Sequence, residues 1–443
     1  MEGGYGDIEK SQDNLTLALH GEFVSFKLLG ITHQFNAGVT TERSQAVYDR
    51  TEKHNYYFYK ANEDVVCTEN STECIAGEQF VYYKKLYYKD KAEAEITLYD
   101  AYVDDVMTLG PFTLRPGIHA SYNDLTQNTD YAPRLAFFYD LLQNKKTVLH
   151  AGVNRYYGKT LLTYKLREGI APYDRYNRST KLTSDNYPVG WPDLPSERRV
   201  ALSRFASLDT PYVDEWSVGI DQEVFGGLFS LSYVSRDGED LLGLTTFDAN
   251  EDNIVYSEWN NNGESRHEEV TASWERQWQN HYCLVDVTWQ DSESSNEDYG
   301  DSLEQEDLDE IVWYNGHKTY KINLPRSDYN REWSANLVYS VKLPYGFSFT
   351  NITRYRSGYK AIADTKENFD LPDGEKLDIY DDVSYPSSTT FDWKLAWAYS
   401  VTETQIMTIT ADVTNVFNRK LYTGVEDEYE MGRQLWVGID YTF

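Results

Sequence analysis

The chain alternates apolar and polar residues in runs that reach ten to sixteen residues. The segment FDWKLAWAY places Phe391, Trp393 and Leu395 on one parity and Asp392 and Lys394 on the other. Because successive side chains of a strand point to opposite faces, such a run predicts a strand with one apolar and one polar face. No segment shows a sustained helical period with capping residues.

Fifteen strands of this kind are predicted. They exceed the five or six residues that are typical of soluble sandwiches, and they reach the length that a tilted strand needs to cross a bilayer. The predicted strands are residues 15–28, 31–46, 87–109, 111–124, 131–142, 147–159, 210–224, 228–242, 266–277, 282–291, 331–342, 347–360, 389–401, 405–421 and 433–443.

Short and long connections alternate between these strands. VFGGLF, QWQNHYC, LPYGF and SVTETQI each join two strands within a few residues. Compact soluble domains rarely carry several unstructured loops of 20 to 50 residues, whereas outer-membrane barrels combine short periplasmic turns with long extracellular loops. We therefore predict an all-β, antiparallel transmembrane β-barrel. Its long loops are expected at residues 49–85, 160–209, 237–265, 291–330, 361–388 and 421–431.

An odd number of strands has a geometric consequence. In an antiparallel meander the first and last of fifteen strands point the same way, so they cannot close antiparallel, and bacterial single-chain barrels have an even count. Either the count is wrong by one or two, or the chain is part of a barrel.

Composition narrows the class of partner. The chain has 41 Lys+Arg against 72 Asp+Glu, a net charge of −31, so nucleic acid is excluded as a partner. No stretch approaches 18 apolar residues, so no membrane-spanning helix is expected. The opening residues MEGGYGDIEKSQDN have no basic flank and no apolar core, so no signal peptide is expected. The 38 Tyr and 11 Trp fit either aromatic girdles at the membrane interfaces or loop platforms for a ligand.

Four stretches, in chain order, resemble the TonB-dependent outer-membrane receptors. They are APRLAFFYDLLQNKKTVLHAGVNRYYG, TPYVDEWSVGIDQEVFGGLFSLSYVSRDGEDLL, ADVTNVFNRKLY and WVGIDYTF. The resemblance covers nearly the whole chain, from GEFVSFKLLGITHQFNAGV onward. Members of that family have a 22-stranded barrel, preceded by a signal peptide, a short box that engages TonB and a plug domain. None of these three segments is recognised here.

The resemblance implies that 22 − 15 = 7 strands are missing from the front. Residues 1–443 would then form a single transmembrane barrel region that is incomplete at its N-terminus and begins within an extracellular loop. We expect either the C-terminal two-thirds of a receptor barrel or one half of a split barrel.

The resemblance also implies a function. Such receptors sit in the outer membrane of Gram-negative cells, in contact with lipid and lipopolysaccharide, and take up a scarce nutrient. The ligand is of the siderophore-iron, cobalamin, saccharide or peptide class, and TonB supplies the energy through a plug, which this chain lacks. The alternatives are a passive outer-membrane pore and a surface ligand-binding barrel without transport. No nucleophile or phosphate-loop motif is present, so neither an enzyme nor a cofactor is expected.

The last residues form the first candidate site. Ile439, Tyr441 and Phe443 share the apolar parity of the final predicted strand, and the chain ends on Phe443. The resemblance implies that they are the signal read by the barrel-assembly machinery, and then part of the strand that seals the barrel. The alternative is a strand that happens to end a soluble domain.

CTENSTEC places Cys67 and Cys74 in a predicted outer loop. A pair this close in an oxidising compartment predicts a disulfide that staples the loop; two free thiols or half of a metal site are the alternatives. Cys283 is left over on a strand and is expected to be inert.

Acidic segments are the remaining candidates. Residues 291–310 contain ten acidic residues and no basic one, which fits cation binding or a solvated external loop. DANEDN at residues 248–253 lacks the Gly of a calcium loop, and no two of the eight His have ligand spacing. No metal site is predicted.

Overall fold

The computed structural model describes residues 7–158, 162–202, 208–246, 254–294, 311–320, 324, 331–371, 376–422 and 429–443. Within these residues the chain is almost entirely β, with one α-helix, α1 (Leu162–Gly169), and a 3₁₀ turn, η4 (Pro344–Gly346). No helix in the described part of the chain is long and apolar enough to cross a membrane.

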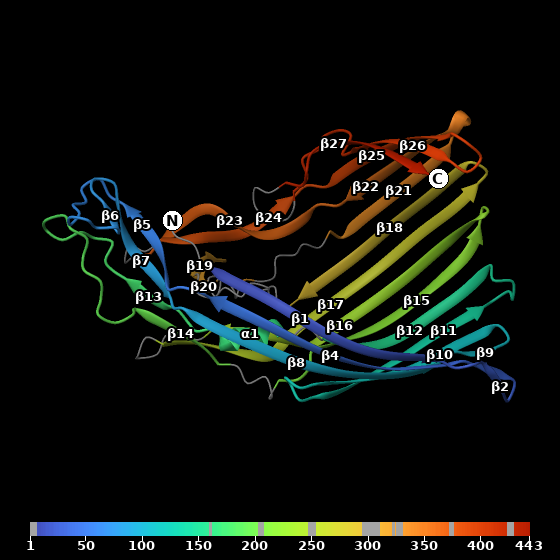
Figure 1. Cartoon of the computed structure of the whole chain (residues 1–443), viewed down its shortest axis with the longest axis horizontal. Coiled ribbons are helices and arrows are strands. Elements are labelled where there is room, and N and C mark those ends of the chain that lie inside the picture. The colour runs from blue at the N-terminus through green and yellow to red at the C-terminus, as the bar shows by residue number, and fades with distance from the viewer. Residues whose placement is uncertain are drawn as a thin grey trace.

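Fifteen long strands of the described chain form one curved antiparallel sheet, which we call the wall (Figure 1). Each strand pairs with the next one in the following order, which confirms both the predicted fold class and the predicted strand number. The strands are β1 (Ile8–Glu22), β4 (Phe35–Arg50), β8 (Asp90–Asp105), β10 (Phe112–Asn123), β11 (Thr129–Asp140), β12 (Thr147–Tyr157), β15 (Tyr212–Val224), β16 (Gly227–Thr246), β17 (Ile254–Trp278), β18 (His281–Ser294), β21 (Trp333–Lys342), β22 (Phe347–Arg356), β25 (Ser388–Ser400), β26 (Ile406–Thr414) and β27 (Gln434–Thr442).

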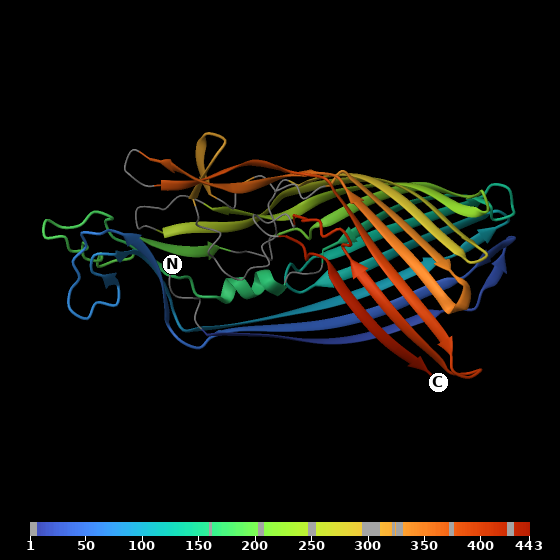
Figure 2. The same ribbon diagram turned by 90° about the horizontal axis from the view of Figure 1, so that it is seen from above.

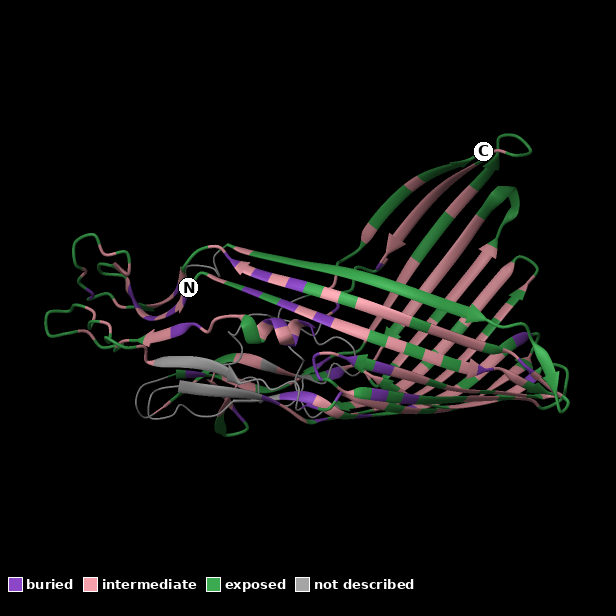
Figure 3. Cartoon of the chain, turned by 60° about the horizontal axis from the view of Figure 1, so that its bottom comes forward, coloured by how far each residue is buried: buried purple, intermediate pink, exposed green. Residues whose placement is uncertain are grey.

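The wall is an open trough, with β1 at one edge and β27 at the other (Figures 2 and 3). In the described residues β1 pairs with β4 alone and β27 pairs with β26 alone. Because fifteen strands alternate in direction, the two edge strands run the same way.

Short turns lie at one end of the trough, and long connections lie at the other (Figure 1). The N-terminus is at the end with the long connections, and the C-terminus is at the end with the short turns. The hairpin between β15 and β16 shows how the short turns form. Phe225 and Gly226 have φ of 52° and 70°, and two positive φ values make the turn type whose twist matches antiparallel strands. Three short strands, β2 (Phe26–Leu28), β3 (Ile31–His33) and β9 (Met107–Leu109), extend the turns at this end.

The described residues of the long connections contain strands, so the prediction that these connections are unstructured is wrong. One connection forms a small sheet from β5 (His54–Ala61), β6 (Cys74–Ile75) and β7 (Gln79–Tyr87), which β13 (Asp174–Asn177) joins from the next long connection. A strand of that second connection, β14 (Glu197–Leu202), pairs in parallel with β17. A separate four-stranded sheet is built from β19 (Ile311–Tyr314), β20 (His317–Tyr320), β23 (Tyr359–Asp370) and β24 (Lys376–Tyr385).

The loop predicted at residues 237–265 is also wrong, because β16 continues to Thr246 and β17 begins at Ile254. Strands that project beyond a membrane meet water on both faces, so they need no apolar alternation, and the alternating pattern gives no sign of them. Two predicted acidic segments, residues 248–253 and most of residues 291–310 (295 onward), lie outside the described residues.

Buried side chains gather at the loop end of the trough, while most of the wall is intermediate or exposed (Figure 3). There α1 packs against β4 and β8. Its Tyr164 meets Trp259 edge-on, with ring centroids 4.7 Å apart, in a cluster that also contains Tyr48 and Ile96. The wall itself exposes an apolar outer face, to which Leu17 of β1 and Val437 of β27 belong. The buried core of the described residues therefore packs the loop end together, whereas the apolar face of the wall is not covered by protein.

Candidate functional site

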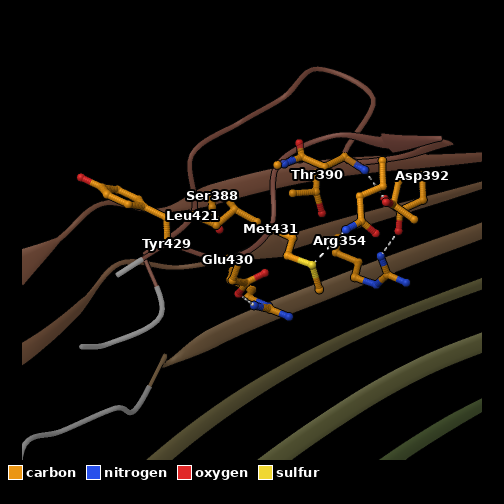
Figure 4. Close-up of a pocket in the computed structure, with 13 residues that line it drawn as sticks. Arg354, Ser388, Thr390, Asp392, Leu421, Tyr429, Glu430 and Met431 are labelled. Carbon is orange, nitrogen blue, oxygen red and sulfur yellow. Dashed lines mark hydrogen bonds and ion pairs between the residues drawn. The ribbon is translucent and has the colours of Figure 1, made fainter. Parts of the chain in front are cut away.

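A cavity of about 530 Å³ lies where the loop end of the wall meets the segment that precedes β27 (Figure 4). Four charged residues line it, namely Arg354, Arg356, Asp392 and Glu430. The other lining residues that matter here are the polar Ser388 and Thr390 and the apolar Leu421 and Met431. The residues come from β22, β25 and the connection between β26 and β27.

The β22 sequence FSFTNITRYR places both arginines on one face of the wall. Tyr355 lies between them and points to the opposite, apolar face, as the alternation of a strand requires. Arg354 is in register with Thr390, and Arg356 is in register with Ser388, so the neighbouring strand continues the polar face. Residues two apart on a strand are separated by about 7 Å, and this sets the spacing of the two guanidinium groups at their base.

Arg354 is paired with the wall. Its Nη1 donates to Oδ2 of Asp392 on β25, and Figure 4 shows the two side chains pointing toward each other. The other carboxylate oxygen of Asp392 accepts a hydrogen bond of 2.7 Å from the backbone N–H of Asn415. Asp392 is therefore held by two neighbours, Arg354 on β22 and Asn415 directly after the end of β26.

Arg356 is paired with the residues directly before β27, residues 429–433, which we call the crossing segment. Its Nη1 donates to Oε1 of Glu430 at 2.7 Å. The Glu430 backbone N–H donates to the Leu421 carbonyl at 2.8 Å, and Tyr422 and Tyr429 form an isolated bridge beside it. Glu430 thus lies on the connection between β26 and β27, lines the cavity, and binds Arg356 without being part of a wall strand.

A third arginine stands next to this pair. Arg331 donates to the carbonyls of Ser357 and Tyr422 at 3.0 and 3.2 Å, and its Cζ lies 4.5 Å from the ring centroid of Tyr359. Burial and the nearby charge of Arg356 lower the pKa of Arg331 from its ordinary value. Arg331 does not line the cavity, and the two arginines and two carboxylates that do line it balance in charge, on a chain of net charge −31.

None of these residues stands out in the sequence. Two arginines at i and i+2 on the polar parity of a predicted strand were an available signal, since like charges on one face repel unless something pairs with them. Their carboxylate partners stand on other elements, and no local pattern joins them.

The predicted assembly residues lie together at the turn end. Ile439 and Tyr441 share one face of β27, and the rings of Tyr441 and Phe443 are 6.3 Å apart. Phe443 is almost fully exposed. Their recognition by the barrel-assembly machinery remains a prediction.

The predicted cysteine pair lies in the small loop sheet, where a disulfide joins Cys67 and Cys74 with a Cα–Cα distance of 5.7 Å. Cys283 is a free thiol on β18, in register with Tyr339. No group of three or more His, Cys, Asp or Glu side chains suited to a metal ion occurs in the described residues.

A charged and aromatic cluster fixes the same loop sheet. Glu73 accepts a hydrogen bond of 2.6 Å from Trp191 and lies 3.3 Å from Lys84 Nζ. Lys84 and Arg178 lie over the Trp191 ring at 4.2 and 4.4 Å, and burial lowers the pKa of Arg178. This cluster ties two long connections together beside the disulfide.

The Tyr and Trp residues were predicted to form either membrane girdles or ligand platforms in the loops, and the loop segments HNYYFYK and FVYYKKLYYKD contain seven of the tyrosines. Three of their tyrosines, Tyr56, Tyr83 and Tyr87, are buried in the loop sheet instead. Tyr56 and Tyr87 form a small core with Tyr173. In these segments buried aromatic side chains hold the loop sheet together, and their rings are not open platforms.

Comparison with known proteins gives a consistent result. Residues 35–357 match the family model described as outer membrane beta barrel domain. The uncharacterized protein YddB of Escherichia coli strain K12 is 26% identical over 458 residues, which cover 100% of this chain and 53% of YddB.

Three solved structures share the fold. The outer membrane transporter YddB from Escherichia coli has a TM-score of 0.70 at 22% identity, over 99% of this chain and 55% of that one. FpvA of P. aeruginosa bound to heterologous pyoverdines has a TM-score of 0.56 at 12% identity, over 98% and 48%. The ferric citrate transporter FecA has a TM-score of 0.54 at 11% identity, over 98% and 55%. This chain spans about half the length of these relatives.

Proposed function

The chain belongs to the outer membrane β-barrel domain family, and we propose that it serves in the uptake of a scarce nutrient across the outer membrane. In this proposal the wall lies in the outer membrane with its apolar face against lipid and lipopolysaccharide, and the ordered loops capture the ligand outside. TonB supplies the energy for uptake. The ligand class is a siderophore-iron complex, with cobalamin, a saccharide or a peptide as the other classes to be tested.

One observation carries the proposal: a charged cavity sits at the loop end of a curved transmembrane wall, where an external ligand would arrive first. Structured loops support it, because capture needs a preformed surface more than a simple pore does. Relatives with this fold are described as a ferric citrate transporter and as a protein bound to iron-loaded pyoverdine.

The passive pore is the weaker alternative. A small closed pore made by this chain alone would need β1 to pair with β27, and in the described residues these strands are the two free edges of the wall. A surface-binding barrel without transport shares the cavity and the loops, so an uptake experiment is needed to separate it.

The test is uptake of labelled iron chelates, cobalamin and oligosaccharides by cells with and without the intact gene. We expect saturable uptake of one class that is lost on deletion of the gene, on deletion of TonB and after addition of a protonophore. Uptake that rises linearly with concentration and ignores the protonophore would establish the pore. Ligand that stays at the cell surface would establish the binding protein.

A further inference from the structure

We propose that the Arg354–Arg356 cavity binds a small ligand with two anionic groups, and that this ligand takes the place of the Glu430 carboxylate on Arg356. The inference deepens the proposed function, because it names the chemistry of the ligand that the same site would take. It rests on the charge, the hydrogen bonds and the shape of the cavity.

The cavity is less negative than the chain as a whole. Arg354 and Arg356 line the cavity together with Asp392 and Glu430, so the lining is balanced in charge, and Arg331 lies outside the lining near Arg356. The whole chain carries 72 acidic residues against 41 basic ones, so a cavity with no acidic excess differs from the general trend. A ligand that brings negative charge would meet less repulsion here than at most of the remaining surface.

Both arginines also keep donors in reserve. A guanidinium group has five N–H donors in a planar fork. In the described structure Arg354 donates one hydrogen bond, to Asp392, and Arg356 donates one, to Glu430. Both side chains are partly exposed and line the cavity, so their remaining N–H groups are available to a carboxylate or a similar planar anion, which arginine binds in a bidentate manner.

The two carboxylates differ in how firmly they are held. The Asp392 side chain is 16% exposed and accepts a second hydrogen bond from the backbone of Asn415, directly after the end of β26. The Glu430 side chain is 37% exposed, and it comes from the crossing segment. An exposed ion pair contributes little stability, so a ligand carboxylate competes with Glu430 far more easily than with Asp392.

Glu430 therefore acts as an internal substitute for a ligand carboxylate. When the ligand binds Arg356, the Glu430 carboxylate is released from the wall, while the hydrogen bond from Arg331 to the Tyr422 carbonyl remains. The ligand meets the second arginine about 7 Å further along β22, which sets the spacing of its two anionic groups. Leu421 and Met431 provide apolar contacts for the body between them, and about 530 Å³ suits a compact organic molecule or chelate.

The test uses the full-length protein purified in detergent and three matched probes. The probes are terephthalate, which carries two carboxylates on one ring, benzoate, which carries one, and dimethyl terephthalate, which carries none. Binding is measured by calorimetry for the wild type and for the variants Arg356→Gln, Arg354→Gln and Glu430→Gln. Arg236→Gln is the control, because Arg236 pairs with Glu215 at 2.7 Å on the same polar face outside the cavity, and its side chain is 45% exposed against 43% for Arg356.

We expect terephthalate to bind more tightly than benzoate, and the diester not to bind. Each arginine variant should weaken binding about tenfold or more, whereas Glu430→Gln should strengthen it several-fold because the competing charge is gone. Arg236→Gln should leave the affinity unchanged. Glu430→Gln also decides the question if an arginine variant fails to fold, since a merely structural Glu430 would not gain affinity on neutralisation.

The inference is overturned if terephthalate binds neither the wild type nor Glu430→Gln, or if Glu430→Gln binds no more tightly than the wild type. Binding in detergent does not depend on transport. Terephthalate binding without nutrient uptake in cells would refute the proposed function and leave the cavity assignment standing. Nutrient uptake in cells without terephthalate binding would refute the cavity assignment and leave the proposed function standing.

Discussion

A side-chain carbon on Gly346 would overlap the backbone carbonyl oxygen of Ala398, which lies on β25. Gly346 ends the turn between β21 and β22 with a φ of 81°, and the neighbouring Tyr345 also has a positive φ. The turn is pressed against β25, where Trp397 Nε1 donates to the Tyr345 carbonyl at 3.1 Å. Because a carbonyl oxygen in a strand cannot move without breaking its ladder, only glycine fits this position.

Gly346→Ala should therefore destabilise the wall well beyond the cost of the backbone angle alone. Gly30→Ala is the matched control, since Gly30 has a φ of 87° in a turn at the same end and nothing within 4 Å of the added carbon. The control should cost about 1–2 kcal/mol for the left-handed conformation. The measurement is the urea midpoint of each variant, with heat-modifiable gel mobility as a second readout. Equal midpoints for the two variants would contradict the clash.

The orientation of the wall gives a second prediction. Val287 and Thr288 are neighbours near the middle of β18; Val287 belongs to the apolar face, and Thr288 contacts Thr271 on the polar face at 3.0 Å. Val287→Lys should cost about 2–4 kcal/mol in a bilayer, because a lysine at mid-membrane depth meets hydrocarbon. Thr288→Lys should cost much less, because it faces the interior of the trough. Folding titrations in lipid vesicles measure both costs, and a larger loss for Thr288→Lys would show that the faces are reversed.

The sequence predicted the wall because a strand in a membrane must obey a strict rule. Each residue that faces lipid has to be apolar, so the alternation in β25 or β27 can be recognised from the sequence without knowing which strands they pair with. Beyond the membrane the rule is relaxed. The outer part of β17 contains the polar segment NNNGESRHEE. It keeps its backbone pairing with β16 but does not alternate apolar and polar residues, so the start of the strand at Ile254 was missed.

The cavity was not predictable for a related reason. Arg354 stands 38 residues from Asp392, and Arg356 stands 74 residues from Glu430. The strand register determines the first contact, and the path of the crossing segment determines the second. Polar residues on the inner face of a barrel are common to every strand, so the pattern alone cannot distinguish a binding arginine from one that only faces water. Cys67 and Cys74 could be paired from the sequence because their partners lie seven residues apart.

The disulfide gives a third prediction. Cys67→Ser together with Cys74→Ser should loosen the small loop sheet by roughly 2–3 kcal/mol, the chain-entropy value for so short a closed loop, and leave the wall intact. Limited proteolysis of intact cells should cut the double variant faster between residues 54 and 87. Cys283→Ser is the control and should be cut at the wild-type rate. Unchanged proteolysis of the double variant would mean that the cluster around Trp191 holds this sheet without the disulfide.

The C-terminal residue gives the last prediction, which separates assembly from stability. Phe443 is 91% exposed, and its ring contact in the described structure is with Tyr441, so its deletion removes little from the folded protein. A role as an assembly signal would instead affect recognition of the unfolded chain by the barrel-assembly machinery, before the protein folds. Deleting Phe443 should therefore reduce the amount of folded protein in the outer membrane several-fold, while protein refolded from urea into detergent keeps its wild-type midpoint and terephthalate affinity. Phe225→Ala is the control, because Phe225 is 83% exposed in a turn at the same end. Wild-type levels of folded protein in cells after the deletion would exclude the signal, and a lowered midpoint in vitro would show that Phe443 acts through the stability of β27.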